Sequence, residues 1–158
     1  MNKKYLIKQT LHLDTNHPNF KKPLVLTHAL GKAKEFYLHN NFEYKDEDYH
    51  IILRRGMKTD GASNARIFWN VIPPIAGKYL EAAVIHDGLY RSNAVPRKEA
   101  DDIFLRVMER LGVSWWKRKV IYRAVRLLGY WSYKNPKTKT SFYSQFVIVK
   151  KLNKEEKK

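Results

Sequence analysis

Two short segments of the sequence place ionisable side chains where an apolar helix face is expected. In Ala82–Tyr90, His86 and Asp87 follow Ala-Ala-Val-Ile, and a second segment carries Asp101 and Asp102 side by side. Buried polar groups of this kind either find hydrogen-bond partners or serve a function. A carboxylate that holds one imidazole nitrogen leaves the other free as a general base near neutral pH. Pairing of His86 with an aspartate therefore predicts a general base.

Helical geometry separates the two neighbouring aspartates. Asp101 shares a helix face with apolar side chains such as Phe104, whereas Asp102 lies on the polar side with Arg106. Because a short turn joins this helix to the preceding one, the two helices are expected to pack antiparallel. That arrangement would bring Asp101, but not Asp102, within hydrogen-bond reach of His86.

Two further carboxylates could hold a cation beside this pair. Asp87 projects about 100° around the helix from His86, and Asp60 lies on a loop after the β region. One histidine with carboxylates and loop carbonyls suits Ca²⁺ or Mg²⁺ better than Zn²⁺ or copper. The alternative is purely structural: Asp101 caps or salt-bridges the start of its helix, His86 is a hydrogen-bonded core residue, and the Asp60 loop is only a turn.

The surrounding pattern predicts an α+β fold. Residues 1–55 hold β-branched and aromatic clusters broken by Asn, Asp and Pro, which predict several short antiparallel strands. Helical spacing predicts a three-helix segment: one helix to about Tyr90, one from Pro96 that Gly112 terminates, and one from Trp115 to about Trp131. The last of these has the expected apolar stripe Val120, Ile121, Ala124, Val125, Leu128 and Trp131. A C-terminal strand is predicted within Ser141–Val149.

Length and composition limit the remaining possibilities. With 158 residues, the chain fits a single domain over residues 1–150, followed by a charged tail at 151–158 that we expect to be disordered. The absence of cysteine excludes disulfides, a thiolate nucleophile and a cysteine-based zinc site. The N-terminus lacks the apolar region of a signal peptide, and no apolar run approaches the roughly 20 residues that span a bilayer. We therefore expect a soluble intracellular protein.

Positive charge is concentrated in the C-terminal part of the chain. The formal net charge is +16, and the segment 110–154 contains twelve Lys and Arg but no Asp or Glu. Such a segment attracts polyanions, so nucleic acid and an anionic membrane surface are both candidate partners. Several aromatic residues lie among these charges, and their helical spacing favours a place in the core. No helix-turn-helix, zinc-finger or RNA-recognition signature accompanies the charge.

Four motifs in this order resemble a known family. They are Gly56–Ser63, Ala82–Tyr90, Arg97–Phe104 and Tyr122–Gly129, and together they resemble the family of domains of unknown function numbered 1353. The resemblance covers about residues 36–133. That family occurs largely in bacteriophages and prophages, so the resemblance implies a phage origin, a location in the host cytoplasm or the virion, and phage structural proteins as partners. It implies no biochemical activity.

A narrower pattern is similar to the catalytic helices of phospholipase A2. The sequence His86-Asp87-x-x-Tyr90 is followed by an Ala-Asp pair that ends in Asp101. The resemblance implies that His86 activates water, Asp87 binds Ca²⁺, Asp101 holds His86, and Tyr90 donates a supporting hydrogen bond. Ester hydrolysis would follow, with Ca²⁺ stabilising the oxyanion. The Tyr-x-Gly-x-Gly calcium loop of that superfamily is missing ahead of the helix, where residues 73–79 read Pro-Pro-Ile-Ala-Gly-Lys-Tyr.

Three functions therefore follow from the sequence. The leading hypothesis is a small phage-encoded hydrolase with a His86–Asp101 site. The second is a non-enzymatic virion, tail-assembly or host-factor-binding protein, in which the same polar cluster only holds helices together. The third is a nucleic-acid-binding accessory protein that acts through basic side chains of the third helix, namely Lys117, Arg118, Lys119, Arg123 and Arg126. The sequence indicates no oligomeric state.

Overall fold

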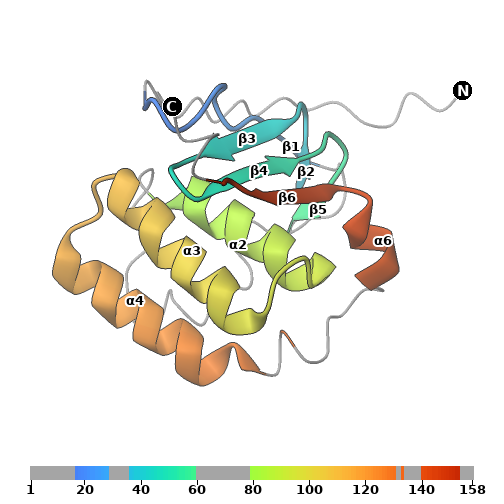
Figure 1. Cartoon of the computed structure of the whole chain (residues 1–158). Coiled ribbons are helices and arrows are strands. Elements are labelled where there is room, and N and C mark those ends of the chain that lie inside the picture. The colour runs from blue at the N-terminus through green and yellow to red at the C-terminus, as the bar shows by residue number, and fades with distance from the viewer. Residues whose placement is uncertain (1–16, 29–35, 60–78, 131–132, 134–139, 154–158) are drawn as a thin grey trace, which may run out of the picture.

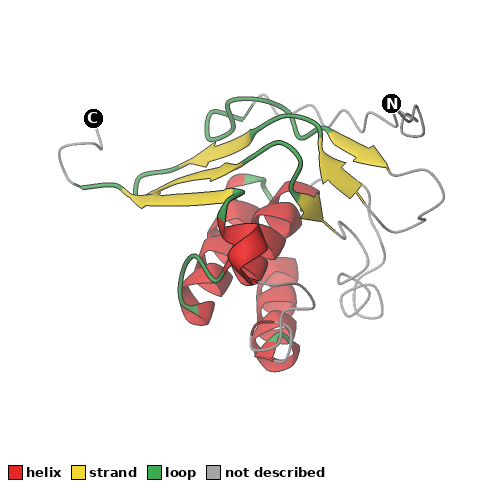
Figure 2. Cartoon of the chain, turned by 90° about the vertical axis from the view of Figure 1, so that its right-hand side faces the viewer, coloured by secondary structure: helices red, strands yellow, loops and turns green. Residues whose placement is uncertain are grey.

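The computed structural model describes residues 17–28, 36–59, 79–130, 133 and 140–153. Short antiparallel strands form one side of the molecule, and three long helices lie together on the other side (Figures 1 and 2). The order of strands, helices and a final strand confirms the predicted α+β fold. Among the described residues, no helix combines the length and apolarity needed to cross a membrane.

The first sheet packs against the helices through its last strand. It contains β1 (Leu26–His28), β2 (Phe36–Leu38) and β5 (Lys58–Thr59), all antiparallel, in the order β1-β2-β5. Leu38 lies opposite Leu26, and both side chains are buried. Thr59 at the end of β5 is also fully buried, and this strand contacts α2 (Leu80–Ser92).

The second sheet pairs a hairpin from the first half of the chain with the C-terminal strand. β4 (Tyr49–Leu53) lies between β3 (Phe42–Lys45) and β6 (Val147–Lys151), with antiparallel pairing on both sides. Alternate residues face the core, as expected for strands with one buried face. The inward-facing set consists of Phe42, Tyr44, Ile51, Leu53 and Val147.

The predicted strand over Ser141–Val149 is half wrong. Residues Thr140–Ser144 form the short helix α6, and β6 begins only at Val147. The helical turn buries Tyr143 against α2, where its hydroxyl oxygen accepts a hydrogen bond from Arg91 at 2.9 Å. This contact with α2 overrides the local strand preference of the aromatic residues. β6 runs to Lys151, which pairs with Tyr49, one residue past the expected domain end at 150.

Helices α2 and α3 (Arg97–Arg110) form the predicted antiparallel pair. Asn93 ends α2 in the left-handed conformation, with φ 49°, and Pro96 stands directly before α3. Gly112 has φ 70°, which confirms the glycine terminator, because L-residues with side chains rarely adopt this conformation. The buried residues of α3 are Ala100, Asp101, Ile103, Phe104, Val107 and Met108, so Phe104 and Asp101 share a buried face as predicted.

The outermost helix, α4 (Trp115–Leu128), buries less than the sequence predicted. Only Ile121 and Val125 of the expected stripe are buried, while Val120 and Leu128 are exposed and Trp131 lies outside the described residues. Of the aromatic residues in the basic segment, several of which were expected in the core, Tyr143 is buried, whereas Trp115, Trp116, Tyr130 and Phe142 are exposed. For the residues of α4 the reason is position, because α4 packs on α3 at the edge of the molecule, away from the strands (Figure 1).

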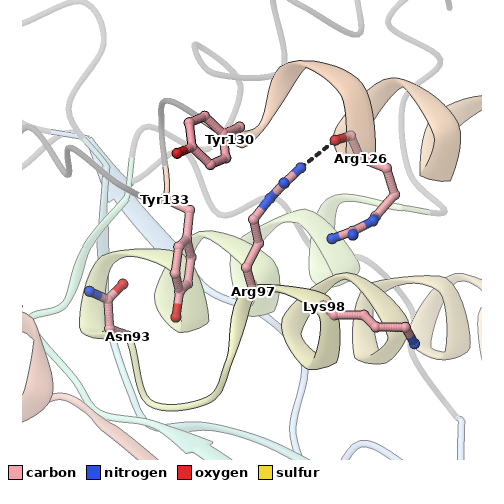
Figure 3. A pocket seen from close by; sticks show the side chains of 6 residues that line it. All are labelled: Asn93, Arg97, Lys98, Arg126, Tyr130 and Tyr133. Atoms are coloured by element: carbon pink, nitrogen blue, oxygen red, sulfur yellow. Dashed lines mark hydrogen bonds between the residues drawn. The ribbon is translucent and has the colours of Figure 1, made fainter.

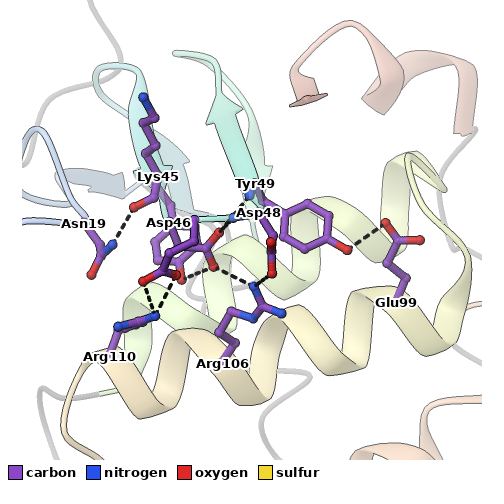
Figure 4. A network of polar contacts seen from close by, with 10 residues as sticks. Asn19, Lys45, Asp46, Asp48, Tyr49, Glu99, Arg106 and Arg110 are labelled. Carbon is purple, nitrogen blue, oxygen red and sulfur yellow. Dashed lines mark hydrogen bonds and ion pairs between the residues drawn. The ribbon is translucent and has the colours of Figure 1, made fainter. Parts of the chain in front are cut away.

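A polar network ties the outer side of α3 to the turn between β3 and β4 (Figure 4). The buried Asp46 carboxylate accepts hydrogen bonds from the backbone N–H of Tyr49 and from the Tyr44 hydroxyl, which fixes the turn. Arg106 donates to Asp48 at 2.5 Å, and Arg110 donates to Glu47. These contacts hold α3 in a fixed register against the second sheet. α3 in turn sets the position of Asp101.

Candidate active site

His86 and Asp101 meet between α2 and α3. His86 Nε2 lies 2.9 Å from Asp101 Oδ1. The His86 side chain is 11% exposed, and the Asp101 side chain is completely buried. The antiparallel packing of the two helices creates this contact, as the sequence predicted for Asp101.

Asp101 is ionised in the folded protein. Burial alone would raise the pKa of Asp101, but hydrogen bonds from His86, Tyr90 and Arg126 outweigh burial and hold the pKa below its ordinary value. An ionised carboxylate has no proton to donate, so His86 Nε2 must carry the proton of this hydrogen bond. In the neutral form of the imidazole, that hydrogen bond leaves Nδ1 unprotonated.

Two aromatic rings fix the orientation of the imidazole. The Tyr90 ring centroid lies 4.0 Å from that of His86, and the Phe104 centroid lies 4.7 Å from it. The Tyr90 hydroxyl also donates a hydrogen bond to the Asp101 oxygen that accepts from His86. Within the described parts of the chain, His86 Nδ1 has no hydrogen-bond partner. Its lone pair is therefore available to a water molecule or a ligand.

A third helix also holds Asp101. Arg126 of α4 donates a hydrogen bond to Asp101 Oδ2 at 2.7 Å, and this contact raises the pKa of Arg126. Arg97 Nε lies 3.9 Å from the same oxygen. The sequence indicated Arg126 only as part of a basic surface. The Ala-Val-Arg spacing of α4 gave no sign that this arginine turns inward, because the register of α4 on α3 decides it.

The neighbouring aspartate behaves as the helix-face argument predicted. Asp102 points away from His86 and pairs with Lys98 at 2.6 Å and with the Tyr122 hydroxyl at 2.7 Å. Its side chain is 43% exposed. The pKa of Asp102 is nevertheless lowered, because these two hydrogen bonds outweigh its partial burial.

Asp87 faces a different side of α2. One of its oxygens accepts a hydrogen bond from Thr59 at 2.8 Å, and the other accepts from Arg91 at 2.7 Å. Arg91 in turn donates to Tyr143, so this chain of contacts links β5, α2 and α6. It does not include His86.

The hydrogen bonds of Asp87 with Thr59 and Arg91 occupy oxygens that the predicted calcium site would need. Ca²⁺ takes six to eight oxygen ligands, whereas the Asp87 carboxylate is already engaged by a guanidinium and a hydroxyl group. Among the described residues, no three His, Asp or Glu side chains converge on one point. Asp60, the second expected ligand, lies outside the described residues. The described donor set does not fit the ion, and calcium binding stays a prediction.

One buried acid escaped the sequence-based prediction. Glu81, in the first turn of α2, is 1% exposed, and neither carboxylate oxygen has a hydrogen-bond partner among the described residues. Burial raises the pKa of Glu81. In the sequence Glu81 looks like an ordinary acidic residue at a helix N-terminus, where negative charge is favourable.

Comparisons with known proteins agree with the four-motif resemblance. Residues 36–125 match the family described as "Protein of unknown function (DUF1353)". The chain is 37% identical over 75 residues to "Uncharacterized protein y4jT" of Sinorhizobium fredii (strain NBRC 101917 / NGR234), which covers 47% of this chain and 22% of that relative. The aligned part is thus about a fifth of the relative's length. No solved structure matches the chain.

Proposed function

This chain belongs to the family described as Protein of unknown function (DUF1353), and we propose that it is a hydrolase whose general base is His86. The matched residues 36–125 include His86, Tyr90 and Asp101. The observation that carries the proposal is the bond from His86 Nε2 to the buried Asp101, which leaves Nδ1 without a partner among the described residues.

The proposed reaction is attack of water on an ester carbonyl. Nδ1 of His86 takes a proton from water as the new carbon–oxygen bond forms, and the imidazolium later returns that proton to the leaving alkoxide. Asp101 stabilises the positive charge that forms on His86. Tyr90 is a positioning residue, because it touches the Asp101 carboxylate and the face of the imidazole. No step is assigned to a metal ion.

The test is an ester-hydrolysis assay of the full chain with matched variants. Substrates are p-nitrophenyl esters of increasing acyl length and phospholipid vesicles, which also test the similarity to phospholipase A2. We expect His86→Ala to abolish turnover and leave the fold intact. His50→Ala is the control, because His50 lies on β4 and contacts Glu43, away from Asp101. Turnover by His86→Ala equal to that of wild type would refute the proposal.

The metal-assisted form of this reaction has a separate test. Ca²⁺ and Mg²⁺ are titrated into metal-free protein by calorimetry, and the titration is repeated with Asp87→Asn. Binding that the substitution removes would support a cation at Asp87. Binding that survives it, or no binding, would confine the proposal to the His86–Asp101 pair.

A structural role is the second candidate, and one observation favours it. Asp101 accepts hydrogen bonds from His86 and Tyr90 of α2 and from Arg126 of α4, so one carboxylate joins three helices. A phage virion or assembly protein would need only this bracing. The two candidate roles differ in whether they need Nδ1 of His86. The structural role needs only the hydrogen bond from Nε2 to Asp101, whereas the enzymatic role also needs the unprotonated Nδ1. In the structural case, His86→Gln should keep the folded stability close to that of wild type. In the enzymatic case, the same substitution should abolish ester turnover.

A further inference from the structure

An open pocket of about 520 Å³ lies where the end of α2, the start of α3 and the end of α4 meet (Figure 3). Its described lining consists of Asn93, Arg97, Lys98, Arg126, Tyr130 and Tyr133. Three of these six residues are cationic, and no acidic residue is among them. His86 does not line the pocket either, so the pocket is separate from the free nitrogen of the proposed base.

Arg97 supplies the charge that is least neutralised. Its Nη2 donates to the backbone oxygen of Arg126 (Figure 3) and to that of Val125, both of which are uncharged acceptors. Its Nε is buried, has no hydrogen-bond partner among the described residues, and lies 3.9 Å from Asp101 Oδ2. Because that carboxylate is already bonded to His86 and Arg126, it balances the positive charge of Arg97 only in part.

Lys98 and Arg126 each form an ion pair with one carboxylate and remain partly exposed. Lys98 contacts Asp102 at 2.6 Å, and its side chain remains 73% exposed. Arg126 contacts Asp101 through Nη1 and is 34% exposed. Three cations against these two carboxylates leave one net positive charge. The first turn of α3 adds its positive dipole end, and Pro96 before it provides no side-chain cap.

Two tyrosine rings and Asn93 form the rest of the described wall. The Arg97 guanidinium lies 5.8 Å from the centroid of the Tyr130 ring, which keeps the ring and the charge together. The Tyr133 hydroxyl donates to the Val95 carbonyl oxygen at 3.0 Å, which fixes that ring. Flat aromatic walls suit a flat ring of a ligand. The volume lies within the range of about 300–1,000 Å³ that is usual for small-molecule sites.

We propose that this pocket binds a small organic phosphate. The phosphate group contacts Arg97, Lys98 and Arg126, and a flat ring of the same ligand packs on Tyr130 and Tyr133. Binding at this pocket does not require the proposed hydrolysis at His86.

Calorimetric titration of the full chain tests this site with three probes. Adenosine 5′-monophosphate carries both the phosphate and the ring, inorganic phosphate carries only the former, and adenosine only the latter. We expect the nucleotide to bind more tightly than either part. Lys98→Gln should weaken nucleotide binding on the order of tenfold, equivalent to about 1.4 kcal/mol. Lys98 is chosen because its exposed side chain does not contact the core.

Two further variants separate a built site from general charge attraction. Arg123→Gln removes an exposed cation of α4 that does not line the pocket, and its nucleotide affinity should stay within twofold of wild type. Tyr130→Leu should reduce the preference for the nucleotide over inorganic phosphate. Absence of binding by both phosphate probes at millimolar concentration would overturn the proposal. Equal weakening by Arg123→Gln and Lys98→Gln would overturn it as well.

Discussion

Gly129 lies so close to Tyr90 that a β-carbon on Gly129 would be 2.9 Å from the Tyr90 hydroxyl oxygen. The same β-carbon would be 2.6 Å from the Val125 carbonyl oxygen. Gly129 follows the last turn of α4 and has a helical φ of −74°, so space rather than backbone conformation requires glycine here. The hydroxyl that needs this space is the one that donates to Asp101.

Gly129→Ala should therefore disturb the proposed site by displacing the Tyr90 hydroxyl from Asp101. We expect a loss of about 1–3 kcal/mol in the free energy of unfolding, typical of overpacking, together with lower turnover. Gly112→Ala is the control, since a β-carbon there meets nothing within 4 Å and only its φ of 70° is strained. Urea unfolding and the ester assay measure both effects. Turnover unchanged in Gly129→Ala would show that the Tyr90 hydroxyl does not position the site.

The two adjacent aspartates should differ sharply when each is changed to asparagine. Asp101→Asn leaves buried donors facing a neutral group and should cost about 3 kcal/mol of stability, as breaking a buried ion pair does. Asp102→Asn removes a half-exposed pair with Lys98 and should cost less than about 1 kcal/mol. Ester turnover should fall in the first variant only. Equal effects in the two variants would contradict the assigned helix faces.

The stability of the fold should also depend on pH through Asp101. Because the folded pKa of Asp101 is lowered, its contribution is complete above the ordinary aspartate value of about 3.9 and is lost as pH falls through the folded pKa. The difference in unfolding free energy between wild type and Asp101→Asn should therefore shrink as the pH falls below about 4. Urea unfolding at several pH values measures it. A difference that is constant with pH would refute the ionised state of Asp101.

Glu81 should show the opposite sign. Burial raises its pKa, so its neutral form suits the folded state, and stability is lost as pH rises through the folded pKa. Glu81→Gln should raise the free energy of unfolding at pH 7 by about 1–3 kcal/mol, since it removes the cost of burying an acid that ionises in the unfolded chain at this pH. The gain should shrink in acid. Glu109→Gln, at an exposed ion pair with Arg118, is the control and should change little.

Sequence periodicity predicted the helices well because their apolar spacing and their terminators are local signals. The face of Asp101 and the end of α3 at Gly112 both followed from such signals. α6 and the exposure of Trp115 could not be predicted in this way. Both depend on which element lies beside them, and the chain places α4 at the edge while α2 draws Tyr143 inward.

In the candidate site, too, local sequence signals predicted some contacts and tertiary packing determines the others. The pairing of His86 with Asp101 follows from two helices and one short turn, so sequence spacing was enough. The contacts of Asp87 with Thr59 and of Asp101 with Arg126 join segments 28 and 25 residues apart. Such contacts require the strand register and the packing of α4, which no local pattern encodes.

Asp101 holds His86 with one oxygen and Arg126 with the other, and Arg126 also lines the pocket for which phosphate binding is proposed. The proton on the imidazole and an anion in the pocket therefore share one carboxylate as intermediary. Thermodynamic reciprocity then applies: if a bound anion changes the proton affinity of the imidazole by some factor, protonation changes the affinity for the anion by that same factor. Acid would act on the pocket as an effector, and the pocket ligand would act on the imidazole in return.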